Sequence, residues 1–250
     1  MHLKKMKMKK QLLLLLLCLS LVSYAQLNKF KNGTIIYETY LNTDIKKDLN
    51  NVSKEIRTKI FKLLKKAKKI NCILKFKNNK TLFSLKDKME NDAEKGLNIA
   101  KIGIQGVYYT DIFKNEIIHQ NESFGKLFLI SKKPIKWKLT QEKKNIGTYL
   151  CYKATAEIKG ENRSGFFTKK IIAWYAIDIP LSFGPKDYSG LPGLIIKLQE
   201  GRRTFILTKI NLNKTENIII KKPAKGEKVS SEKYHQIVKK IVLNRDKMKY

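Results

Sequence analysis

The sequence predicts an α+β fold: one curved, mostly antiparallel β-sheet, open or half-barrel, with a long N-terminal amphipathic helix and a C-terminal helix packed on it. Many short apolar runs alternate with period two and are separated by turn residues, as in strands. Their connections are short, which favours antiparallel neighbours. An apolar stripe with helical spacing lies near each end of the mature chain. We therefore expect helices laid across one sheet.

Residues 1–25 are typical of a secretory signal peptide. Five lysines between Lys4 and Lys10 precede an apolar run over Leu12–Val22, and Ser23-Tyr24-Ala25 provides the small residues of a cleavage site. The apolar run is too short to span a bilayer, which needs ~20 residues. We expect an exported protein with one domain over residues 26–250 and no transmembrane segment in the mature chain.

The first strand is expected at Gly33–Leu41, and the long helix follows it. Apolar residues recur at steps of three or four from Ile45 to Ala67, and Thr43 is a suitable N-cap. The opposite face is rich in lysine. A basic amphipathic helix of this kind usually packs on a sheet with its lysines in water, but it can also lie on a membrane.

From Ile70 onward the period becomes two. Asn71–Phe76 and Thr81–Leu85 form a predicted hairpin around the turn 77–80, and Asp87–Ala100 is expected to be a loop or a short helix. The last helix is expected to start from a Ser230/Ser231 cap. The further expected strands are Gly106–Phe113, Glu116–Gln120, Lys126–Ile130, Ile135–Thr140, Tyr149–Ile158, Phe166–Ile177, Leu194–Gln199, Thr204–Leu212 and Asn217–Lys221.

The chain is strongly basic. It has 53 Lys plus Arg against 21 Asp plus Glu, a formal net charge of +32, but only five of the cations are arginine. Recognition of nucleic acids relies on the planar guanidinium, whereas lysine suits any solvated surface. We expect no specific nucleic-acid partner, although a weak attraction to anionic lipid headgroups or phosphates is consistent with the charge.

Common catalytic and metal-binding motifs are missing from the sequence. His119 and His235 have no Cys or His partner at ligand spacing, and the nucleophile elbow, phosphate loop, dinucleotide fingerprint and HExxH motif do not occur. We predict no catalytic residues, no metal and no cofactor, and a protein that is not an enzyme; a hydrolase assembled from remote Asp, Glu and Ser residues is the alternative. In an exported chain Cys72 and Cys151 either form a disulfide or are two separately buried thiols.

The segment from Ala173 to Gln199 is the most informative for a binding site. It contains two Pro/Gly turns, and Leu191-Pro192-Gly193-Leu194 has the pattern of a type II turn with positive φ at Gly193. A rigid turn beside aromatic side chains can form the floor of a ligand or partner surface, although the same residues can cover a core. The candidate residues are Trp174, Tyr175, Phe183, Gly184, Pro185, Tyr188, Gly190, Leu191, Pro192 and Gly193.

Gly190–Ile195 spells the motif GLPGLI, and here the chain resembles the GLPGLI family of exported proteins. Further matching segments are Ile179-Pro180, Gly184-Pro185, Ala173-Trp174-Tyr175, Gly147–Thr155 and Ile135–Leu139, so the resemblance covers residues 108–200. Gly160–Arg163 departs from the family pattern and implies a longer hairpin tip. The resemblance implies a location in the periplasm or at the cell surface of a bacterium with an outer membrane. It supplies no agreed function and no catalytic residues.

These observations lead to an expected function in the cell envelope. We expect a monomeric, non-enzymatic binding or carrier protein for a lipid or another hydrophobic or amphipathic envelope component, since the layout is similar in architecture to lipoprotein-carrier folds. The alternative is a protein–protein interaction module, in which the turn over residues 184–193 docks an outer-membrane transporter or another envelope complex. A cavity of several hundred Å³ on the concave face favours the carrier, and a filled face favours an interaction or structural role.

Overall fold

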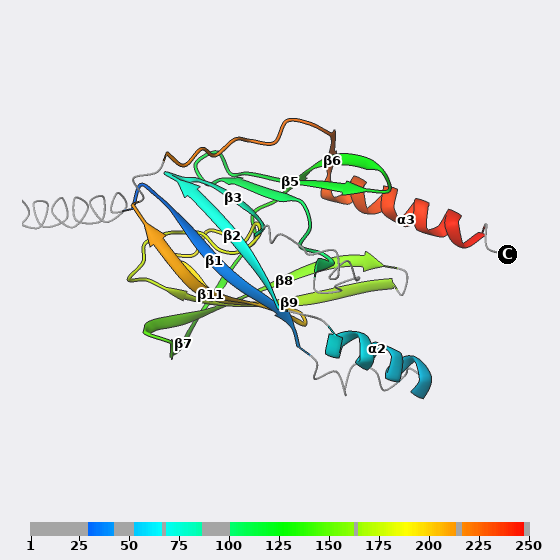
Figure 1. The fold of residues 1–250 in the computed structure, drawn as a ribbon, viewed down its shortest axis with the longest axis horizontal. Coiled ribbons are helices and arrows are strands. Elements are labelled where there is room, and N and C mark those ends of the chain that lie inside the picture. The colour runs from blue at the N-terminus through cyan, green and yellow to red at the C-terminus, as the bar shows by residue number, and fades with distance from the viewer. Residues whose placement is uncertain are drawn as a thin grey trace, which may run out of the picture.

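Twelve strands form one open, mixed sheet in the computed structural model, which describes residues 30–42, 53–66, 69–86, 101–162, 165–213 and 217–247 (Figure 1). The strand order is β12-β6-β5-β4-β3-β2-β1-β11-β10-β9-β8-β7. Neighbouring strands are antiparallel except for β12, which pairs parallel to β6. The strands are β1 Asn32–Leu41, β2 Ile70–Lys77, β3 Lys80–Leu85, β4 Val107–Asp111, β5 Glu116–Ser123, β6 Lys126–Lys132, β7 Lys138–Ile146, β8 Tyr149–Asn162, β9 Gly165–Ala176, β10 Leu194–Glu200, β11 Arg203–Leu212 and β12 Glu227–Ser230.

The predicted hairpin is confirmed as β2 and β3. Along β2 the buried residues Cys72, Leu74 and Phe76 alternate with more exposed ones, as expected for a strand with one covered face. The turn between the strands needs a positive φ, and Asn78 supplies it at 52° because asparagine tolerates the left-handed region.

The sheet is strongly bent, so that one face becomes an inner face. Register shifts interrupt β1 after Ile36, β10 after Ile195 and β7 after Leu139. Such bulges increase twist and bend the strands that contain them. As a result the ring of Phe83 on β3 lies 6.0 Å from that of Tyr108 on β4 and 6.1 Å from that of Phe205 on β11.

The connection between β9 and β10 covers the inner face. We call residues 177–193 the inner segment, since Ile179, Leu181, Phe183, Tyr188 and Leu191 from it are buried in the same core as the strands. The ring of Phe183 lies 5.6 Å from that of Phe76 on β2. Main-chain bonds hold the segment in place, because the N–H of Ile195 donates to the carbonyl of Phe183 at 3.0 Å.

The prediction of an α+β fold with helices across the sheet is wrong. The described part of the chain has two short helices, α2 (Lys54–Lys66) and α3 (Ser231–Lys247). Figure 1 shows α2 beyond the end of β1 and away from the sheet. Helix α3 lies at one end of the strand order, where it contacts β12, β6 and, through the Tyr234 hydroxyl, β5. The physical reason is that a sheet's apolar face needs one cover, and here bending and the inner segment already provide it.

The long N-terminal helix expected from residue 45 is not seen; within the described residues a helix begins at Lys54. The carbonyl of Ser53 accepts from the N–H of Arg57 at 2.9 Å, and the Ser53 hydroxyl caps the first turn. The predicted cap Thr43 lies outside the described residues, as does the predicted loop 87–100. The cap of the last helix is confirmed, since the N–H of Lys233 donates to Oγ of Ser230 at 3.1 Å.

The strand predicted at Asn217–Lys221 is also wrong. This stretch crosses the outer face of the sheet as an extended strap, and the strand lies further on, at β12 (Figure 1). Its alternation is real, because Ile218 is buried and Ile220 packs against a small outer cluster around Tyr109 while Ile219 points to solvent. The alternating pattern therefore arises because every second side chain packs on the sheet, although the segment itself is not hydrogen-bonded into the sheet as a strand.

Gly193 gives a test of this packing. A Cβ atom added there would lie 2.1 Å from the carbonyl oxygen of Ala176, a main-chain atom that cannot turn aside. We expect Gly193→Ala to lower the free energy of unfolding by about 2 kcal/mol or more, in the range of overpacked sites. Urea unfolding of the exposed variant Pro192→Ala, with a loss under about 1 kcal/mol, is the control. Equal losses in the two variants would contradict the close approach.

Candidate functional site

Most residues predicted to form a ligand or partner surface are part of the core. Tyr175, Phe183, Gly184, Pro185, Tyr188, Leu191 and Gly193 are buried, Trp174 is half-buried, and Gly190 and Pro192 are exposed. Trp174 points to the outer face, where the Nζ atom of Lys144 lies 4.0 Å from its ring centroid. The structure therefore separates Trp174 from the inner segment that follows it in the sequence.

The glycines of the inner segment have structural roles that differ from the one predicted from the sequence. Gly193 does not have a positive φ, so the type II turn predicted there is wrong; the positive φ of 91° is at Gly190. Gly184 and Gly193 allow close approach instead. A Cβ atom on Gly184 would meet Ile195 at 2.5 Å and the carbonyl oxygen of Tyr188 at 2.8 Å.

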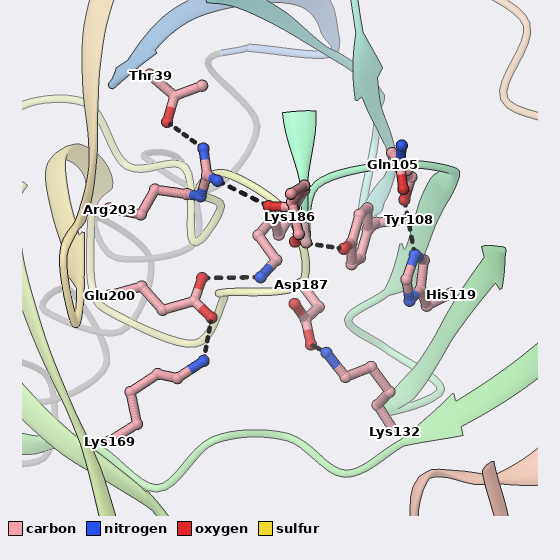
Figure 2. A network of polar contacts seen from close by, with 12 residues as sticks. Thr39, Gln105, Tyr108, His119, Lys132, Lys169, Lys186, Asp187, Glu200 and Arg203 are labelled. Atoms are coloured by element: carbon pink, nitrogen blue, oxygen red, sulfur yellow. Dashed lines mark hydrogen bonds and ion pairs between the residues drawn. The ribbon is translucent and has the colours of Figure 1, made fainter. Parts of the chain in front are cut away.

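Two successive charged residues at the tip of the inner segment connect opposite halves of the sheet. Nζ of Lys186 lies 2.7 Å from Oε2 of Glu200 on β10, and Asp187 forms an ion pair with Lys132 on β6 (Figure 2). Six strands separate β10 from β6 in the sheet order. The pair Lys186-Asp187, which we call the clamp, therefore joins strands that are far apart along the sheet.

Further polar contacts extend the clamp on both sides. Glu200 also accepts from Nζ of Lys169 at 3.1 Å, so its two oxygens are both engaged. Arg203 donates to the carbonyl of Ile102 at 2.8 Å and to the hydroxyl of Thr39 at 3.3 Å (Figure 2). Buried polar groups are stable only with such partners, so this network is a structural requirement of the bent sheet.

Both carboxylates of the network stay ionised at neutral pH. Burial alone would raise the pKa of Asp187, but the cations Lys132 and Lys186 outweigh it and hold this pKa below its ordinary value. Burial opposes ionisation of Glu200 in the same way, and Lys186 and Lys169 lower its pKa. The ion pairs are therefore present at physiological pH.

His119 stacks beside this network. Its ring lies 3.9 Å from that of Tyr108 with 7° between the planes, and its Nε2–H donates to the carbonyl of Gln105 at 2.9 Å. Burial lowers the pKa of His119 to about 4, and the nearby cations Lys132 and Lys186 act in the same direction. The imidazole is neutral in the folded protein at pH 7, and its place is that of a packed aromatic ring.

Cys72 and Cys151 are free thiols in the structure, and both are buried. Burial raises the pKa of Cys72 to about 12 and that of Cys151 to about 11, so both are protonated at neutral pH. A protonated and buried thiol is a poor nucleophile. Among the described residues, no group of three or more His, Cys, Asp and Glu side chains is arranged to hold a metal ion.

An open groove of about 560 Å³ lies at one end of the sheet, on residues that the sequence analysis did not single out. The turns β2–β3 and β4–β5 meet there, joined by the N–H of Ile112, which donates to the carbonyl of Asn79 at 3.0 Å. The strap closes one side, where Nζ of Lys77 donates to the side chain of Asn217. The groove is lined by Lys77, Asn78, Asn79, Lys80, Asp111, Phe113, Lys114 and Asn217–Ile220.

This turn groove, as we call it, combines exposed apolar side chains with cations. Two large apolar residues of the lining are exposed, Phe113 by 81% and Ile219 by 60%. Three lysines line it against one carboxylate, Asp111, which is buried and accepts from the N–H of Lys114 at 3.2 Å. The lining therefore combines exposed apolar side chains with a surplus of positive charge.

Residues 159–197 match a family model described as a protein of unknown function, Porph_ging. The match includes all of β9, the inner segment and about half of β10. No curated protein matches the chain. Two solved structures of PNGF-II, in C2 and P21 crystal forms, are similar over 83% and 82% of this chain, with 15% and 16% identity and TM-scores of 0.48 and 0.45. The chain spans about a third of the length of each, 32%.

We predict from this network that the free energy of unfolding falls as the pH is lowered. The unfolded chain binds a proton on histidine near pH 6.5, whereas His119 in the fold binds one only near pH 4, so stability falls between these values. The lowered pKa values of Glu200 and Asp187 add a further loss as pH falls below their ordinary values of 4.5 and 3.8. We expect the neutral state of His119 to lower the free energy of unfolding by at most about 2 kcal/mol between pH 7 and pH 5.

Urea unfolding at pH 7 and pH 5 measures this loss. His119→Gln should remove most of the difference between the two pH values, while His235→Gln on the exposed side of α3 should leave it as in the wild type. The same pH dependence in the wild type and in His119→Gln would show that His119 is not held neutral.

Proposed function

We propose that the protein is a non-enzymatic, exported protein of the cell envelope that binds an anionic amphiphile, a molecule with an acyl chain and a negatively charged headgroup. The binding site is the turn groove. The observation that carries the proposal is that the exposed residues Phe113 and Ile219 line one groove together with three lysines.

The filled inner face supports a ligand on the surface over one enclosed by the sheet. Phe183, Tyr188 and Leu191 of the inner segment occupy the space that a carrier would leave for an acyl chain. The alternative interaction module, with residues 184–193 as its docking turn, would have only Gly190 and Pro192 exposed for contact. We therefore favour the turn groove as the place of binding.

The chemistry of the turn groove fits the two parts of an amphiphile. An acyl chain laid over Phe113 and Ile219 would remove apolar surface from water, at about 25 cal/mol per Å². Lys77, Lys80 and Lys114 would contact a phosphate or carboxylate headgroup as point charges. Without the five lysines of the signal peptide the formal charge of +32 becomes +27, which would still raise the local concentration of anions around the protein.

The envelope location in this proposal comes from the sequence. The signal peptide expected over residues 1–25 and the motif Gly190–Ile195 support an exported member of the GLPGLI family, and the match to the Porph_ging model over residues 159–197 is in keeping with a family of unknown function. No helix among the described residues is long and apolar enough to cross a membrane.

A lysolipid titration tests the proposal. We expect the mature chain to bind fluorescent lysophosphatidic acid, below its critical micelle concentration, more tightly than the zwitterionic lysophosphatidylcholine. Phe113→Ser/Ile219→Ser should weaken this binding by about tenfold or more, because each side chain contributes about 1.5–3 kcal/mol when fully buried. Added salt should weaken binding through screening of the lysines.

Ile177→Ser is the matched control, since Ile177 is 45% exposed and is not part of the groove lining. It should bind like the wild type. The proposal is wrong if the wild type does not bind the anionic probe, if the two lysolipids bind equally, or if the groove variant binds as well as the control.

A further inference from the structure

Helix α2 does not take part in the packing of the sheet. Figure 1 shows it beyond the end of β1, and no described strand packs along it. Ile56 in its first turn is 52% exposed, and none of the described side chains of the helix is fully buried. The N-terminus of the helix is nevertheless stabilised, by Ser53 as its cap and by Glu55 in its first turn.

The sequence of α2 is amphipathic and basic. Ile56 and Ile60 are four residues apart, so they share one face of the helix. Six of its 13 residues are Lys or Arg, and Glu55 is its one acid. Such an apolar stripe usually packs against a sheet, but in α2 it does not.

We propose that α2 lies on an anionic bilayer surface, with Ile56 and Ile60 toward the acyl chains and its lysines at the headgroups. A helix with a large apolar face, a strongly basic polar face and low mean hydropathy is typical of those that lie in the interface. At 13 residues it is about 20 Å long, too short to span the hydrocarbon core of ~30 Å.

The charge of α2 favours a bilayer over a second copy of this chain as the surface that covers its apolar face. Two α2 helices packed face to face would bring together six cations from each against one acid from each, so their charges would repel. Anionic headgroups instead complement the helix, at about 1 kcal/mol for each lysine near the surface. This site is separate from the turn groove and does not depend on the function proposed for it.

Vesicle flotation of the mature chain tests the inference. We expect binding to vesicles of equal phosphatidylglycerol and phosphatidylcholine, and little to pure phosphatidylcholine. Ile56→Ser/Ile60→Ser should weaken partitioning by about tenfold or more. Lys59→Gln/Lys62→Gln should also weaken it, and more than Lys126→Gln/Lys209→Gln, a control that removes the same charge from exposed lysines of two strands. Equal losses in the two lysine pairs would show attraction to the basic surface at large and overturn the inference.

A fluorescent reporter checks the orientation of the helix. An environment-sensitive dye on Ile56→Cys should become brighter and shift to the blue when anionic vesicles are added, whereas the dye on Lys59→Cys should change little. Cys72 and Cys151 are buried and should not compete for the label. No shift at position 56 on vesicle-bound protein would contradict the proposal. The groove variant Phe113→Ser/Ile219→Ser should float like the wild type, so failure of one site is distinguishable from failure of the other.

Discussion

The bent sheet depends on the ion pairs of the clamp. Lys186 and Asp187 are neighbours in sequence, yet one pairs with Glu200 on β10 and the other with Lys132 on β6. Removing one partner of a buried pair typically costs about 3–5 kcal/mol because the remaining charge stays buried. Lys186 also has a φ of 58°, a strained value for a side-chain-bearing residue, which the surrounding contacts maintain. The two halves of the sheet are thus fixed relative to each other by one dipeptide.

This constraint determines which surfaces of the described part of the protein stay exposed. With the clamp formed, the apolar side chains of the inner segment lie against Phe76 and the rest of the core, and the inner face is covered without a helix. The helices are then free for other roles, and the surface features that need explanation lie outside. These are the turn groove with Phe113 and the basic helix α2. Both combine apolar side chains with lysine, and the two binding proposals rest on that combination.

The sequence predicted the strands well and the cover of the sheet poorly. Alternation placed the β2–β3 hairpin and most other strands because each has one buried face. It could not distinguish a hydrogen-bonded strand from the strap. In the strap, Ile218 and Ile220 pack on the sheet in alternation, but the segment is not hydrogen-bonded into it as a strand. The helical stripe near residue 56 indicated an amphipathic helix, but amphipathicity does not say which surface the helix meets.

The candidate site shows the same limit. The sequence singles out the segment around Gly190–Gly193, but Gly193 reflects close packing, and nothing in the local sequence marks Lys186 and Asp187 as a link across the sheet. A signal for them existed: Glu200 and Lys132 fall on the inward side of their strands, next to Leu198 and Ile130, where a charge needs a partner. Which residue supplies that partner depends on the bend of the whole sheet, and local spacing does not contain this information.

Amide hydrogen exchange in Lys186→Met tests the clamp most directly, with Lys197→Met on the outer side of β10 as the control. Methionine keeps the length of the side chain and removes the charge. We predict faster exchange, by about tenfold or more, in both β10–β11 and β5–β6, because the two halves of the sheet lose their link. Faster exchange confined to residues 183–190, or the same exchange as in Lys197→Met, would contradict this account.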